Sequence, residues 1–221
     1  MTAFSIAFMH TVAGPDHYLP FLVLGRAENW SFKRIMFYTL AGGVAHILSS
    51  LIIGFLAVML GWSAGSIDFL NGIRGTFAIW ALVAVGVIYM IVGLIKVYLS
   101  TSDHSHGHSH EHSHDHFHFF GRKFTGGAGK RTALALIVIF LLGPCEPLIP
   151  LLLLPSAGHS ILALIIIISV FAGTTLFTQA CCLSLAFLGI GLFEFNIVKR
   201  YMHVFSGMAI ATSGLILVFL S

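Results

Sequence analysis

Charged residues are scarce in this sequence. Only 9% of its 221 residues are Asp, Glu, Lys or Arg, whereas an ordinary soluble domain carries about 25%. Hydrophobic residues make up 57% of the chain, and a soluble core of this size could not enclose so much apolar surface. A bilayer accommodates such a surface around the outer faces of helices. The composition excludes a soluble globular protein and predicts an all-α integral membrane protein.

Cysteine is also scarce, and three cysteines without a pairing pattern predict no disulfide framework. The sequence contains neither a nucleophile–base set nor a phosphate-binding loop, so we do not expect an enzyme. The formal net charge of +3 reflects how the basic residues are distributed among the loops. It gives no reason to expect a nucleic acid partner. The expected partner is the lipid bilayer, and nothing in the sequence specifies an oligomeric state.

Six apolar stretches are each long enough to cross a bilayer. They cover residues 4–24, 35–60, 77–99, 132–154, 161–187 and 204–220. Ten of the eleven Lys and Arg residues fall in segments on one side of this layout: Arg26, Lys33, Arg34, Lys96, Arg122, Lys123, Lys130, Arg131, Lys199 and Arg200. Only Arg74 falls on the other side. The positive-inside rule therefore predicts a plasma (inner) membrane protein with these ten residues in the cytoplasm and both termini outside.

The sequence divides into two three-span halves, residues 1–100 and 132–221, joined by residues 101–131. The first span of each half contains a Gly-Pro pair, beginning at Gly14 and at Gly143, with another proline about two turns later. Proline lacks an N–H and disturbs the preceding turn, so we expect both helices to be broken there. Freed carbonyls in a membrane need a partner inside the protein or in a wet cavity.

Glycines support the same division. Gly86 and Gly93 in the third span match Gly207 and Gly214 in the sixth at one constant offset. Because each half has an odd number of spans, the second half must be inverted relative to the first. Inverted repeats with interrupted helices are typical of transporters, whose binding site lies near the bilayer midplane. An ordinary bundle with kinked helices is the alternative.

Ionisable side chains are concentrated within the spans of the first half: His10, Asp16, His17 and His46. An ionised Asp at a helix centre costs roughly 2.5–3.5 kcal/mol on insertion scales, so it needs a partner or a role. Imidazole and carboxylate together suit Ni, Co, Zn, Fe or Mn better than Na. These four residues are therefore predicted to bind a metal. The alternative is that Asp16 and His17 only pair with each other or cap a half-helix.

The second half has fewer ionisable groups. Its candidate polar residues are Cys145, Glu146, Thr174, Thr175 and Gln179. The Glu146 carboxylate offers charge compensation or a proton site, and a Cys145 thiolate would be a soft metal ligand. Thr and Gln within membranes either join helices by hydrogen bonds or line a pore, and both alternatives stay open here.

A histidine tract lies between the two halves. Eight of the thirteen histidines alternate with other residues here, at His104, His106, His108, His110, His112, His114, His116 and His118. The segment has no residues from which a core could form. Imidazoles in a flexible chain bind Ni, Co, Cu and Zn. We expect the tract to capture, buffer or sense metal in the cytoplasm; a pH-sensing segment and an expression tag are the alternatives.

The residues His10 to His17 resemble the nickel/cobalt transporter superfamily, in which a His precedes an Asp-His pair within one helix. Five residues separate His10 from Asp16, as in the related urease-accessory transmembrane proteins, whereas four is usual. The tract resembles that of the nickel/cobalt efflux branch, and the inverted layout resembles the wider lysine-exporter superfamily. The resemblance implies His10, Asp16 and His17 as ligands with His46 a further one. It also implies nickel or cobalt as cargo, no bound cofactor, and export slightly favoured over import.

Two other functions compete with transport. A membrane metal sensor, or an accessory protein for metalloenzyme assembly, would use the tract but leaves the intramembrane ligands unexplained. A thiol–disulfide electron carrier would use Cys145 after Pro144. The corresponding position in the first half is Asp16, so the second redox cysteine is missing.

Overall fold

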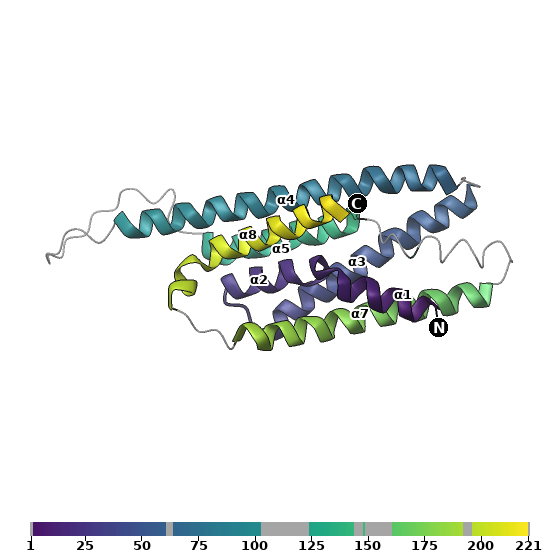
Figure 1. Cartoon of the computed structure of the whole chain (residues 1–221), viewed down its shortest axis with the longest axis horizontal. Helices are drawn as coiled ribbons and strands as arrows, with labels where there is room; N and C mark the ends of the chain where they lie inside the picture. Colours follow the sequence, from purple (N-terminus) through teal and green to yellow (C-terminus); the bar gives the residue numbers. More distant parts are fainter. Residues whose placement is uncertain are drawn as a thin grey trace, which may run out of the picture.

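A computed structural model describes residues 2–60, 64–102, 124–143, 148, 161–191 and 196–220. Within these residues the chain is helical and contains no strand. The α-helices are α1 (Thr2–Ala13), α2 (Leu19–Ala27), α3 (Phe32–Met59), α4 (Ala64–Ser102), α5 (Phe124–Leu142), α7 (Ile161–Gly191) and α8 (Asn196–Leu220), with one 3₁₀ turn, η1 (Pro15–His17). Figure 1 shows them running roughly along one long axis.

In the described part of the chain, four helices are long and apolar enough to cross a membrane, over Phe32–Leu56, Phe69–Leu99, Ile161–Gly189 and Tyr201–Phe219. Large apolar side chains on their outer faces are exposed, which in a membrane protein places them against lipid. The helix α1 is apolar but shorter. The predicted fourth span is described only as far as Gly143, apart from Leu148. The described part of the chain is therefore all-helical, and these four helices indicate a membrane protein.

Helices α4 and α8 begin well before the apolar stretches used to predict them, at Ala64 rather than 77 and at Asn196 rather than 204. Hydropathy marks only the part of a helix that suits lipid, whereas backbone hydrogen bonds continue the helix into polar surroundings. The 39 residues of α4 extend about 58 Å at 1.5 Å per residue, nearly twice the hydrocarbon thickness of about 30 Å.

The first apolar segment is broken, as predicted from its Gly-Pro pair. The helix α1 closes with a bond from the Gly14 N–H to the His10 carbonyl. Bonds of i→i+3 type then form η1, from His17 to Gly14 and from Tyr18 to Pro15, both at 3.2 Å. Pro15 and Pro20 supply no N–H, so a continuous α-helical ladder cannot run through this segment.

Glycines bring α4 and α8 into close antiparallel contact (Figure 1). Gly86 and Gly93 are seven residues apart on one face of α4, and Gly207 and Gly214 have the same spacing on α8. A Cβ at Gly86 would collide with the backbone of Ala211. The matched glycines therefore serve as small residues at one helix–helix interface, where backbones approach closely.

Candidate functional site

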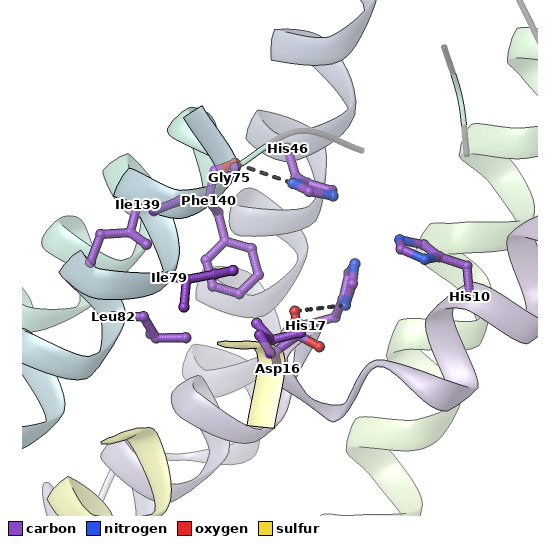
Figure 2. A pocket seen from close by; sticks show the side chains of 12 residues that line it. His10, Asp16, His17, His46, Gly75, Ile79, Leu82, Ile139 and Phe140 are labelled. Atoms are coloured by element: carbon purple, nitrogen blue, oxygen red, sulfur yellow. Dashed lines mark hydrogen bonds and ion pairs between the residues drawn. The ribbon is translucent and has the colours of Figure 1, made fainter. Parts of the chain in front are cut away.

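Three histidines, two of them buried and one half-buried, meet beside the break in the first helix. They are His10 on α1, His17 on η1 and His46 on α3, and we call them the histidine trio. One ligand nitrogen from each ring lies within 4.8 Å of the others. His17 and His46 are only 4% and 7% exposed. Figure 2 shows the three rings facing one another, so the structure brings together three of the four predicted first-half ligands as one group.

Hydrogen bonds define which nitrogen of two of these rings carries a proton. The Nδ1 of His17 lies 3.0 Å from the Gly14 carbonyl, and the Nδ1 of His46 lies 3.2 Å from the Phe140 carbonyl. A carbonyl can only accept, so each Nδ1 must be the N–H donor. In the neutral ring, Nε2 then keeps its lone pair and can bind a metal ion.

All three Nε2 atoms of the trio are buried and have no hydrogen-bond partner among the described residues. Leaving a buried polar atom unsatisfied costs about 1–3 kcal/mol. Three such atoms converging at one place require an explanation, because most buried polar atoms in proteins are paired. A coordinated metal ion satisfies all three lone pairs at once. The donor set of three imidazoles suits Ni, Co, Zn, Cu or Fe.

Asp16 lies beside the trio and is not grouped with its ligand atoms. Its Oδ2 is 3.4 Å from Nδ1 of His17, at the edge of the ring that points away from His46 (Figure 2). A carboxylate next to the non-ligating nitrogen is a common arrangement around metal-binding histidines, where it orients the ring and makes it more basic. Direct coordination by Asp16 stays a prediction.

Gly14 provides the space in which this turn forms. A Cβ at Gly14 would lie 2.8 Å from Nδ1 of His17, 2.9 Å from Oδ1 of Asp16 and 3.0 Å from the His10 carbonyl. Its φ of −100° is accessible to any residue. Glycine is therefore required here by close approach and not by backbone conformation.

A cavity of about 160 Å³ adjoins the trio. Its remaining wall is largely apolar and comes from α4, α5 and α8, including Ala78, Leu82, Phe140 and Leu217. Three nitrogen ligands leave coordination positions open on a tetrahedral or octahedral ion. The cavity has room for water in those positions, while its apolar wall offers few competing ligands.

Gln179 of α7 ties the ligand-bearing turn to the rest of the bundle. It is completely buried, and its Nε2 donates to the His17 carbonyl at 2.7 Å and to the Thr39 carbonyl at 3.1 Å. It therefore joins η1 and α3, the two elements that carry His17 and His46. Thr174 is half-buried and Thr175 is buried on the same helix. Among the described residues that line the cavity, none belongs to α7.

Two supporting groups escape prediction from the sequence. The Phe140 carbonyl that holds His46 is a backbone atom, which no residue pattern marks. Arg74, predicted in an outer loop, lies on α4 and donates to the Ser49 hydroxyl and to the Leu141 carbonyl. A cation at the last carbonyls of α5 is favourable for the helix dipole. Arg74 stands three residues before the apolar stretch predicted from residue 77, and this proximity was the available signal.

Cys145, Glu146 and the eight histidines of the tract lie outside the described residues. Their predicted roles stay predictions. Comparison of the chain with family models, with curated proteins and with solved structures finds no match.

Proposed function

We propose that this protein is a membrane transporter of divalent first-row transition-metal ions, with nickel or cobalt as the cargo. One observation carries the proposal: three buried imidazole nitrogens converge without any hydrogen-bond partner in the described part of the chain. The ion binds to the histidine trio, and Asp16 orients His17 or joins the coordination sphere. No other cofactor is required.

The position of the trio supports transport. His46 lies near the middle of the apolar stretch Phe32–Leu56, so the ion is bound near the bilayer midplane. A metal sensor or an assembly accessory needs its ligands at the surface, whereas a transporter needs them at this depth. Broken helices with a site at the break are also typical of alternating-access transporters.

The proposed architecture has six spans in two inverted halves. The segment 4–24 crosses as the broken pair α1 and α2, and the fourth span continues beyond α5. Rocking of one half against the other exposes the ion to each side in turn. The basic segments and the histidine tract face the cytoplasm, and both termini face outward, in the inner membrane. With the tract collecting metal from the cytosol, export is slightly favoured over import.

The test is metal flux into proteoliposomes containing the purified protein, measured separately for Ni, Co, Zn, Mn and Fe. His17→Ala and His46→Ala each remove one of three ligands, and we expect flux to fall at least 100-fold, beyond the 10- to 100-fold typical of losing a supporting residue. Asp16→Asn should reduce flux about 10- to 100-fold, because the Asn side chain is uncharged.

Thr212→Ala is the matched control, since this exposed hydroxyl bonds only the Met208 carbonyl of its own helix. Its flux should equal that of the wild type. Unchanged flux in both His17→Ala and Asp16→Asn would sink the proposed site.

A further inference from the structure

A second polar cluster lies away from the trio, where the end of α2 meets α4 and α8. It comprises Glu28 at the end of α2, Tyr89 on α4 and His203 on α8, and we call it the inner cluster. The Tyr89 hydroxyl donates to Oε1 of Glu28 at 2.9 Å. Its oxygen lies 2.9 Å from Nδ1 of His203. Because the only hydroxyl proton is used on Glu28, the His203 Nδ1–H donates to the phenol oxygen.

The turn after α2 fixes the position of Glu28. Asn29 adopts a left-handed conformation with φ 52°, and the Trp30 N–H bonds the Gly25 carbonyl at 2.8 Å. This is the usual way to end a helix, and Asn is one of the few residues other than Gly that tolerates it. A Cβ at Gly129 of α5 would lie 2.7 Å from the Glu28 side chain. The Glu28 side chain is consequently only 6% exposed.

One apolar seam connects the inner cluster with the cavity of the trio. Its packed residues include Phe21, Leu24, Leu82, Leu136, Ile139 and Ile210, from α2, α4, α5 and α8. On α4, Ala78 at the cavity and Tyr89 in the inner cluster are three turns apart, about 16 Å. On α5, Phe140 and Gly129 have the same separation. Polar groups thus mark both ends of a seam that is otherwise apolar.

We propose that Glu28 and His203 form a second divalent-metal site at this end of the seam, with Tyr89 occupying it when no ion is bound. The inference rests on the proposed function for the identity of the ion. The ends of α4 and α5 that flank the histidine tract lie on this side of the bundle. The site would exchange ions between the tract and the trio.

The donor atoms suit this role. Oε1 of Glu28 and Nδ1 of His203 are 3.9 Å apart. Two ligands bound at about 2.1 Å to one ion lie roughly 3.0–3.4 Å apart, so the two atoms must approach each other by about 0.5–0.9 Å. The Tyr89 hydroxyl must leave, and the His203 proton must move from Nδ1 to Nε2, which leaves the ring neutral. His203 is 28% exposed, so water can complete the coordination.

The test counts Co²⁺ bound per chain by equilibrium dialysis of the full-length protein in lipid nanodiscs. The histidine tract is intact in every variant, so the number of ions bound by the tract is the same in each and cancels in the comparison. Glu28→Gln and His203→Gln should each bind one Co²⁺ fewer than the wild type. Tyr89→Phe should keep this ion and bind it about three- to tenfold more tightly, because the competing hydroxyl is gone, a change equivalent to one net hydrogen bond. Tyr98→Phe, on the exposed face of α4, is the control and should match the wild type.

The opposite effects of these variants separate metal binding from simple misfolding, which would lower binding in all three. Wild-type stoichiometry in both Glu28→Gln and His203→Gln overturns the inference. Loss of the ion in Tyr89→Phe as well would make the cluster a structural brace, and also overturns it. His17→Ala, measured in parallel, tests the proposed function separately: if it retains every ion while Glu28→Gln loses one, the trio fails and the inner site stands.

Discussion

The histidine trio and the inner cluster each place an imidazole beside a carboxylate, Asp16 and Glu28 respectively, and they differ in how their hydrogen bonds are completed. In the trio, Nδ1 of His17 and of His46 is satisfied by a backbone carbonyl, while every Nε2 is left without a partner in the described chain. In the inner cluster, a tyrosine bridges the carboxylate and the imidazole, so the groups satisfy one another. The first arrangement is ready for a ligand, whereas the second must break internal bonds to accept one.

This difference suits two steps of a transport cycle. A preorganised site loses little free energy to rearrangement and binds tightly. A site that exchanges its own hydrogen bonds for a ligand binds more weakly and releases more readily. The expected order of affinity is therefore the trio above the inner cluster. Two variants test this contrast by altering the trio and leaving the inner cluster intact, and a deletion of the tract tests the step that precedes both.

Gly14→Ala should have the largest effect. The added Cβ would collide with His17, with Asp16 and with the His10 carbonyl, so the trio cannot keep its geometry. We expect metal affinity at the trio to fall about 10- to 100-fold, as for loss of a supporting group. The measurement is Co²⁺ titration followed by its visible absorption spectrum.

Gly173→Ala on α7 is the matched control, because a Cβ there meets nothing within 4 Å. It should bind Co²⁺ like the wild type, with a small gain in helix stability of about 1 kcal/mol. Equal affinities for Gly14→Ala and the wild type would show that the turn is adaptable and the trio is not preorganised.

Gln179→Leu should have an intermediate effect. It removes the donors to the His17 and Thr39 carbonyls with little change of volume, and each net hydrogen bond is worth about 1 kcal/mol. We expect affinity at the trio to fall about tenfold while the inner cluster keeps its ion, measured by the same titration. Ser184→Ala is the control on α7, since its hydroxyl bonds only the Ala180 carbonyl. A parallel loss at the inner cluster would mean that Gln179 acts on the whole bundle.

Deleting residues 103–118 should have the smallest effect on the transport step. On the proposed function, the tract would raise the local metal concentration beside the protein, so its loss should raise the cytoplasmic metal concentration needed for half-maximal flux and leave the maximal rate in place. Flux in proteoliposomes measures both quantities. Replacing the eight histidines with Ser is the length-matched control. Complete loss of transport would instead make the tract an essential gate.

Local sequence predicted the features that depend on neighbouring residues. The Gly14-Pro15 pair predicted the helix break because proline removes an N–H wherever it stands. The sequence predicted that His10, Asp16, His17 and His46 gather at one site; the structure groups the three histidines, and metal binding by the four residues stays a prediction. Hydropathy predicted four of the membrane-crossing helices. Hydropathy underestimated the lengths of α4 and α8, because it indicates only the part of a helix that suits lipid. It does not indicate how far the backbone hydrogen bonds of the helix continue.

The tertiary structure decided the features that join distant segments. Glu28 and His203 are far apart in the sequence, and each alone looks like a polar residue near a membrane surface; only the packing of α2, α4 and α8 unites them around Tyr89. The Phe140 carbonyl acts on His46 only because α5 packs against α3. Composition and helix breaks are local consequences of residue type. The pairing of donors with acceptors depends on how the helices pack, and that pairing distinguishes the trio from the inner cluster.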